Sequence, residues 1–310
     1  MRRILFAGLI LTGVLSATAW YYYGKDYTSE FAAKKGTLSE FNVSPAGRDS
    51  MFEKSWLTLK TEAGFSVECG MLVPRTAGKK YSAIILLGGK ATGKHAVDYA
   101  IDIDNVIIVA PDYPYAPRES YTLLEFLADV PEIRQALLDM VPAAMLVTDY
   151  LWTRADVDTT KIVLLGYSFG APFVPCIIAN DRRAAVAAIV YGGGDLRSMI
   201  QHNVARYEGP AASWFVGALS GLLLGPMEPM RFIGRISPTP LIMINGTEDE
   251  QIPRRNVELL YHAAGEPKRI RWLESRHVRP DNPELARKIV RALKEEMEKA
   301  GVLRSDSFGF

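Results

Sequence analysis

The chain has 310 residues, of which 48% are apolar and 23% are charged, and its formal net charge is +1. The apolar fraction is enough for a substantial core, and the charge balance gives no indication of a nucleic-acid partner. The two cysteines, Cys69 and Cys176, lie far apart in apolar stretches, and no Cys/His cluster has metal-ligand spacing. We therefore expect two buried thiols and no metal site.

The N-terminus is unlike that of a cytosolic enzyme. Arg2 and Arg3 precede an uncharged run at 4–23, which contains the small-x-small pattern Ala17-Thr18-Ala19 of a signal-peptide cleavage site. The run is also about long enough to cross a bilayer, with aromatic residues at 20–23 that suit the membrane interface. A cleaved signal peptide and an uncleaved anchor both remain open, with a buried N-terminal helix as the less favoured alternative. Signal peptide and anchor alike predict export, to a periplasmic or other extracytoplasmic location.

The remaining elements are predicted in chain order. Residues 24–50 are polar and mixed, which favours a linker or irregular lead-in. Hydrophobic periodicity and turn residues then predict an antiparallel hairpin, several buried strands and the helices between them. The hairpin is expected at 52–60 and 65–73, with buried strands at 83–87, 106–110, 162–165, 184–191, 241–245 and 269–273. Helices are expected at 121–128, 132–153 with a kink at Pro142, 173–180, 255–264 and 283–300.

Strands that alternate with helices indicate a mostly parallel sheet covered on both faces. No repeat or low-complexity block divides the chain, so we expect one catalytic domain at 51–303. Residues 192–232 form an insertion between two of the strands. Its apolar middle, with Trp214 and Phe215, is equally compatible with a lid over a substrate pocket that touches the membrane and with an extra helix packed on the core.

The most informative stretch is 161–172, K-I-V-L-L-G-Y-S-F-G-A-P. A short buried strand leads into Gly166-Tyr167-Ser168-Phe169-Gly170, and a helix-compatible run follows. This is the G-x-S-x-G pattern of a nucleophile elbow, in which larger side chains two residues either side of the serine would collide with the neighbouring strand and helix. The context therefore favours Ser168 as a nucleophile over a serine in an inert glycine-rich loop.

A serine hydroxyl needs an adjacent base, which is usually a histidine oriented by a carboxylate. Of the four histidines, His277 follows the last predicted strand, in a loop at the edge of the sheet where ligand sites collect. His262 lies within a helix, His202 within the insertion, and His95 precedes the serine in the chain. His277 is therefore the predicted base.

The predicted carboxylate is Asp249, which lies three residues beyond Gly246 in the loop after the strand 241–245. Its neighbours Glu248 and Glu250 are expected to be solvated, and Asp195 is the main competitor. The resulting order Ser168, Asp249, His277 is the chain order of α/β-hydrolase triads.

An oxyanion hole requires two backbone N–H groups. One is expected from Phe169, the residue after the nucleophile, and the other from the glycine-rich loop at 88–93. In that loop Lys90 is the first choice and Gly89 the second, with a plain tight turn as the alternative.

Taken together, these motifs resemble the α/β-hydrolase superfamily, nearer its dienelactone-hydrolase-like and prolyl-oligopeptidase-like branches than its lipases. The resemblance covers about residues 50–300 and depends on the stretch at 154–170, on Gly246-Thr247-Glu248-Asp249 with Ile252-Pro253, and on the segment at 263–268 ahead of His277. It implies a cofactor-independent serine hydrolase acting on an ester, thioester or amide. Two features depart from the family pattern: Gly88-Gly89 replaces the common His-Gly, and dienelactone hydrolases use cysteine as the nucleophile.

The favoured function is hydrolysis of a small carboxylic ester or thioester through Ser168, His277 and Asp249. The alternatives are an exported serine peptidase and a membrane-tethered binding module that keeps the fold without the chemistry. The expected partner is a small ester-type substrate, with membrane contact through residues 4–23.

Overall fold

The computed structural model describes residues 24–76, 80–90, 92–100, 103, 105–115, 123–279 and 281–301, together with Gly13 and Ser16. The predicted signal peptide or anchor at 1–23 otherwise lies outside the described residues.

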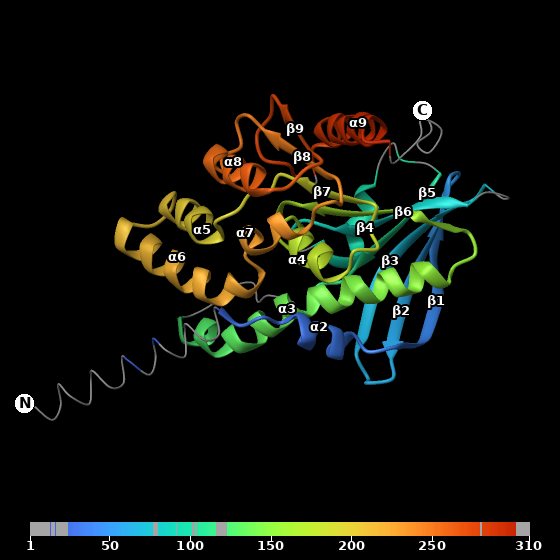
Figure 1. The fold of residues 1–310 in the computed structure, drawn as a ribbon, viewed down its shortest axis with the longest axis horizontal. Coiled ribbons are helices and arrows are strands. Elements are labelled where there is room, and N and C mark those ends of the chain that lie inside the picture. Colours follow the sequence, from blue (N-terminus) through green and yellow to red (C-terminus); the bar gives the residue numbers. More distant parts are fainter. Residues whose placement is uncertain are drawn as a thin grey trace, which may run out of the picture.

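A nine-stranded sheet runs through the described part of the chain, in the order β1-β2-β3-β5-β4-β6-β7-β8-β9 (Figure 1). β1, β2, β3 and β5 pair antiparallel, and the strands from β5 to β9 pair parallel, which confirms the predicted hairpin and the mostly parallel sheet. The strands are β1 Leu38–Arg48, β2 Phe52–Thr61, β3 Ser66–Pro74, β4 Tyr81–Leu87, β5 Val106–Pro111, β6 Val157–Tyr167, β7 Val186–Val190, β8 Leu241–Gly246 and β9 Lys268–Leu273.

Helices cover both faces of this sheet. The α-helices are α2 Thr28–Lys35, α3 Leu123–Thr153, α4 Phe173–Asn180, α5 Leu196–Ala205, α6 Pro210–Leu224, α7 Pro229–Phe232, α8 Arg254–Ala263 and α9 Pro283–Lys299. The described residues also form four short 3-10 helices: η1 Gly93–Tyr99, η2 Ser168–Gly170, η3 Gly225–Met227 and η4 Ile233–Arg235.

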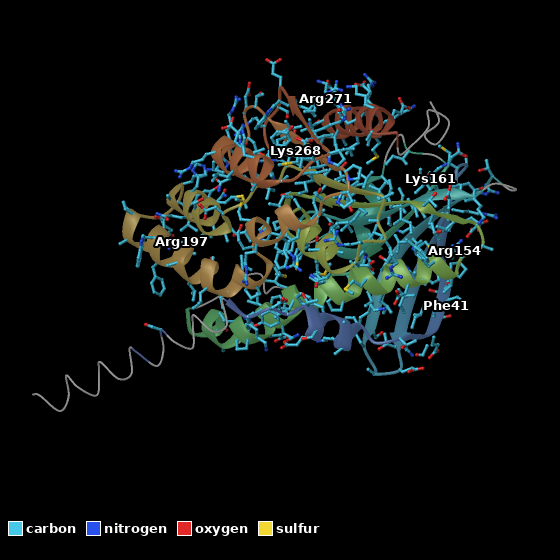
Figure 2. The ribbon with its side chains drawn as sticks, in the orientation of Figure 1. Phe41, Arg154, Lys161, Arg197, Lys268 and Arg271 are labelled. Carbon is cyan, nitrogen blue, oxygen red and sulfur yellow. The ribbon has the colours of Figure 1, made fainter. Side chains whose placement is uncertain are left out.

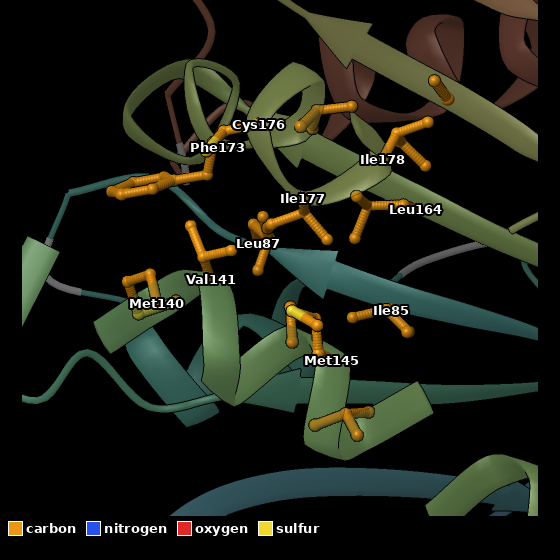
Figure 3. Packing of buried hydrophobic residues seen from close by; sticks show 14 of the residues in the cluster. Ile85, Leu87, Met140, Val141, Met145, Leu164, Phe173, Cys176, Ile177 and Ile178 are labelled. Carbon is orange, nitrogen blue, oxygen red and sulfur yellow. The ribbon is translucent and has the colours of Figure 1, made fainter. Parts of the chain in front are cut away.

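Successive side chains on the central strands point to opposite faces of the sheet, so the core has two halves. Ile85, Leu87 and Leu164 point toward α3 and α4, where Figure 3 shows them packed against residues such as Met145 and Ile177. The adjacent residues on the same strands, such as Ile84 and Leu165, point to the other face, toward η1 and α9. Because successive strand side chains point to opposite faces, the same strands supply both layers. Their near-continuous apolar sequences are those of strands buried on both sides.

Residues 24–50 correct the expectation of a linker or irregular lead-in. They contain α2, whose Phe31 is buried against the core, and β1, which adds an edge strand to the sheet. α2 lies along α3 in Figure 1, and its Lys34 pairs with Asp139 at 2.7 Å. β1 is polar and mostly exposed and contains Pro45, at which its pairing register shifts. Such a sequence lacks strand periodicity, and a proline is tolerated because an edge strand has one unpaired side.

A second correction concerns the long helix. Residues 121–128 and 132–153 were expected as two pieces, but Leu123–Thr153 is one helix with Pro131 and Pro142 inside it. Each interior proline costs roughly 3 kcal/mol. Eleven of its described apolar side chains are buried, and the larger aliphatic ones among them contribute roughly 1.5–3 kcal/mol each, which outweighs that cost. These residues are Ala136, Leu138, Met140, Val141, Ala143, Ala144, Met145, Leu146, Val147, Tyr150 and Leu151.

The insertion at 192–232 folds into α5, α6, η3 and α7. α5 and α6 pack against each other, and α7 packs on α4. Its buried residues Leu196, Met199, Met227 and Phe232 join the half of the core that contains α3 and α4. Among the residues that the structure describes, the helical stretch Pro210–Arg235 is long and apolar enough to cross a membrane by length and composition.

Candidate active site

Ser168 occupies a sharp turn between β6 and the helical segment that follows it. Its φ angle is +48°, in the left-handed region that a residue with a Cβ rarely adopts. A Cβ on Gly166 would lie 2.6 Å from the carbonyl oxygen of Gly170, and one on Gly170 would lie 2.1 Å from that of Leu87. The two glycines are therefore required by close backbone contacts, as the G-x-S-x-G pattern predicts.

Replacing Gly170 by alanine is expected to destabilise the fold by about 1–3 kcal/mol or more, because the atom that the new methyl group meets is backbone at the end of β4. Urea denaturation measures this change. Gly234→Ala is the matched control, since its Cβ would make an ordinary 3.5 Å contact with the Ala263 carbonyl oxygen. Equal stability of the two variants would show that the turn is not sterically constrained.

His277 and Asp249 lie beside this serine. The Oγ of Ser168 is 2.8 Å from Nε2 of His277, and Nδ1 of His277 is 2.8 Å and 3.0 Å from the two carboxylate oxygens of Asp249. The side chains of His277 and Asp249 are only 4% and 2% exposed, although Ser168 itself is partly accessible. A base that is shielded from water and oriented by a buried carboxylate can take a proton from the serine hydroxyl.

The order of the strands explains why these residues meet. β6, β7, β8 and β9 are parallel neighbours, so their C-terminal ends lie along one edge of the sheet. Ser168 follows β6, Asp249 follows β8, and His277 follows β9. The backbone N–H groups of Gln251 and Ile252 donate to Oδ1 of Asp249 at 2.8 Å and 2.9 Å, which fixes the carboxylate.

The other acidic residues considered beside Asp249 do not contact the imidazole of His277 through their carboxylates in the structure. Asp195 accepts the backbone N–H of Ser198 at 3.2 Å and caps the N-terminus of α5. Glu250 was expected to be solvated, but its side chain is only 18% exposed and accepts the backbone N–H of His277 at 3.2 Å. Burial raises the pKa of Glu250, but the N–H groups of Glu250 and His277 and the charge of Arg276 outweigh it and hold this pKa below its usual value.

The glycine-rich loop after β4 is held in place from two sides. The hydroxyl of Tyr113 donates to the carbonyl oxygen of Gly88, and Thr92 donates to that of Gly89 through its backbone N–H at 3.2 Å and its hydroxyl at 2.9 Å. Burial raises the pKa of Tyr113, so this hydroxyl stays protonated and remains a donor. With both carbonyl groups engaged, the loop is fixed where Gly89 and Lys90 border the space in front of Ser168.

The other predicted oxyanion donor, Phe169, immediately follows Ser168 at the start of the turn. Its ring packs edge-on against Tyr113 and Phe173, with centroids 5.1 Å and 5.8 Å apart. Tyr113 therefore contacts both the loop of Gly89 and Lys90 and the residue after the serine. This contact couples the two segments that were predicted to supply backbone N–H groups.

Three residues that contact the site were not predicted to do so from the sequence. They are Tyr113, Glu250 and Tyr191. The ring of Tyr191 lies edge-on to the imidazole of His277, with centroids 5.6 Å apart. Each contacts a partner at least 25 residues away in the chain, so no local pattern could have identified them.

A pocket of about 510 Å³ opens onto Ser168 and His277. Its size is typical of sites for small organic ligands. The walls are largely apolar and come from the strand ends, η1 and α9, with Ile84, Leu86, Leu165 and Val290 among them. Lys90, Asp98 and Arg279 supply charged groups to the lining.

This pocket lies on the face of the sheet that faces η1 and α9, whereas the buried residues of the insertion belong to the opposite half of the core. Among the described lining residues, none comes from 192–232. Of the two interpretations of the insertion, a helical layer packed on the core agrees better with its described residues, because none of them lines this pocket.

The other histidines and the cysteines lie outside this arrangement. His95 contacts Asp98 at 3.2 Å, His202 contacts the carbonyl oxygen of Glu250 at 3.3 Å, and the His262 imidazole contacts that of Glu258 at 2.7 Å. Cys69 and Cys176 are buried free thiols whose pKa values are raised by burial, so neither is a nucleophile. The described residues contain no group of three or more His, Cys, Asp or Glu side chains arranged to hold a metal ion.

Known proteins resemble this chain in sequence over part of its length and in fold over most of it. No family model matches the chain. The uncharacterized protein YfhR of Escherichia coli O157:H7 is 31% identical over 135 residues, which are 43% of this chain and 43% of that protein, so the match spans less than half of this curated relative.

Two solved structures are similar over most of the chain. The acetyl xylan esterase from Paenibacillus sp. R4 has a TM-score of 0.64 and 15% identity, covering 86% of this chain and 93% of that one. Acetyl xylan esterase 1 from Thermoanaerobacterium sp. JW/SL YS485 has a TM-score of 0.62 and 14% identity with the same coverage. At these identities the likeness concerns the fold alone.

Proposed function

The chain has the α/β-hydrolase fold, as the sequence predicts, and on that premise we propose that it is a serine hydrolase that cleaves carboxylic esters. The observation that carries the proposal is the continuous hydrogen-bonded relay from Ser168 through His277 to Asp249 at the edge of an apolar pocket. The esterase neighbours support an ester as the substrate, although they share the fold at low identity.

The proposed reaction has two steps. In the first, Nε2 of His277 takes the hydroxyl proton as Oγ of Ser168 attacks the ester carbonyl carbon, and the resulting oxyanion is held by the backbone N–H groups of Phe169 and Lys90. The C–O bond to the alcohol then breaks, and His277 gives its proton to the departing oxygen. Asp249 stabilises the imidazolium that forms and holds the imidazole in the tautomer that presents Nε2 to the serine.

In the second step water attacks the acyl-enzyme. His277 takes a proton from the water, the carboxylic acid leaves, and the proton returns to Ser168. The pocket walls are largely apolar, so they favour an apolar acyl or alcohol group. Thioesters follow the same chemistry and remain within this proposal.

The test is hydrolysis of p-nitrophenyl acetate, butyrate and octanoate. We expect kcat/KM to rise from acetate to the longer chains, because each buried CH₂ contributes about 0.8 kcal/mol to binding in an apolar pocket. Cleavage of peptide substrates without cleavage of any of these esters would refute the ester proposal and favour the peptidase alternative.

Ala286→Leu tests whether this pocket receives the acyl chain. Ala286 lies on α9 in the pocket wall, so the larger side chain is expected to reduce kcat/KM for octanoate by about 10-fold or more, equivalent to 1–3 kcal/mol, and to spare acetate. Arg291→Leu, at an exposed position of the same helix outside the lining, is the matched control. An equal loss on both esters would place the acyl group elsewhere.

We also propose that the protein is exported. The support is the uncharged run at 4–23 behind Arg2 and Arg3. Sequencing the N-terminus of the protein recovered from the exported fraction separates a cleaved signal peptide from a retained anchor.

A further inference from the structure

Helix α6 is unusual in composition and exposure. It contains no charged residue over its 15 positions, P-A-A-S-W-F-V-G-A-L-S-G-L-L-L, yet only Ser213 and Gly217 are buried. Trp214 and Phe215 are 55% and 58% exposed. The hydroxyl of Ser213 donates to the carbonyl oxygen of Pro210 at 3.0 Å, so this polar group is satisfied within the helix. An uncharged apolar helix of this kind on a protein surface indicates an interaction site.

Two arginine–aromatic pairs lie within the insertion. Arg197 of α5, labelled in Figure 2, lies over the ring of Trp214 at 6.0 Å, and Arg206 lies over the ring of Tyr207 at 5.6 Å. Tyr207 is 80% exposed. Tryptophan and tyrosine beside basic side chains are typical of the interface between lipid headgroups and hydrocarbon.

The chain that leads to the N-terminal apolar run begins next to α6. Arg231 donates from Nη1 to the carbonyl oxygen of Gly225, immediately after α6, at 2.9 Å, and from Nη2 to that of Gly24 at 3.3 Å. Gly24 directly follows the uncharged run at 4–23. If that run enters a bilayer, α6 is held close to the bilayer surface by this contact.

From these three observations we propose that α6 docks on the surface of a lipid bilayer through Trp214 and Phe215. The helix does not span the membrane, because its 15 residues extend only about 22 Å against a hydrocarbon thickness of about 30 Å. The segments that follow it are buried in the core and cannot enter a bilayer: Met227, Phe232 and Ile233 are 4%, 7% and 0% exposed. The exposed side of α6 alone contacts lipid, as in other helices that lie in the plane of the interface.

The test uses the full chain reconstituted into vesicles of phosphatidylethanolamine and phosphatidylglycerol. An environment-sensitive nitrobenzoxadiazole label is attached at Ala211→Cys, an exposed position on the first turn of α6, or at Asn42→Cys, an exposed position on β1. The native cysteines are buried and unreactive. We expect the label at 211 to be quenched several-fold more by lipids with a spin label in the acyl chain than the label at 42, and to be protected from iodide.

The double variant Trp214→Ser/Phe215→Ser, carrying the same label at 211, is expected to lose this quenching and to become as accessible to iodide as the label at 42. Both side chains are exposed, so the thermal unfolding midpoint should stay close to that of the parent chain. The label reports contact with lipid and not hydrolysis, so its result does not depend on whether the protein is an esterase.

Two results would overturn the proposal. Equal iodide access at 211 and 42 would show that α6 faces water. Protection from iodide without quenching by the spin-labelled lipid would show that protein covers the helix, either residues 1–23 or a second copy of the chain.

Discussion

Ser168→Ala is expected to lower kcat/KM for p-nitrophenyl esters by roughly 10⁴–10⁶-fold and to abolish labelling by a fluorophosphonate. The reason is that alanine has no atom to form the acyl-enzyme, while His277 and Asp249 remain in place without a hydroxyl to activate. Residual hydrolysis would come from the pocket and the oxyanion donors. Labelling by a fluorophosphonate reads out the nucleophile directly and needs no knowledge of the natural substrate.

Ser39→Ala, at an exposed position on β1, is the control and should leave both labelling and hydrolysis unchanged. Labelling that persists in Ser168→Ala would assign the nucleophile to another residue. An unreactive parent chain would favour the alternative of a binding module that keeps the fold without the chemistry.

Asp249→Asn is expected to lower kcat by about 10⁴-fold with little change in the folded structure. An asparagine oxygen can still accept the backbone N–H groups of Gln251 and Ile252, so the loop after β8 is retained. The amide has no negative charge, however, and cannot stabilise an imidazolium at His277. Steady-state kinetics together with the thermal unfolding midpoint separate the loss of chemistry from a loss of fold.

The matched control is Asp195→Asn, because Asp195 was the competing candidate for the same role. It caps α5, where asparagine is also a good capping residue, so activity and stability should both stay near the parent values. A large loss of activity in Asp195→Asn, with Asp249→Asn active, would reverse the assignment of the acid.

Much of the candidate site was predictable because its residues occur in local sequence patterns. The strand-turn-glycine pattern identified Ser168, and the positions of Asp249 and His277 directly after buried strands placed them at one edge of a parallel sheet. The geometry brings these three together, while the roles assigned to them stay predictions until the variants are measured. Tyr113 was not considered and Glu250 was wrongly predicted to be solvated, because a hydrogen bond to a distant backbone group leaves no local signal in the sequence.

The fold was predictable where burial selects apolar residues. The central strands are near-continuous apolar runs, and α9 has an apolar face along one side. β1 does not, because an exposed edge strand has no buried side to select apolar residues. Pro131 and Pro142 likewise suggested breaks in α3, since a local rule cannot weigh their cost against packing along the whole helix. The sequence left the role of the insertion undecided, because an apolar helix that covers a pocket has the same composition as one that packs on a core.

The placement of the pocket and the insertion on opposite faces of the sheet has a consequence for how the protein can change. Substitutions in α9 that reshape the pocket share no described side-chain contacts with α6, so their free-energy effects should add. The pocket wall on α9 and the exposed surface of α6 can therefore change separately in evolution.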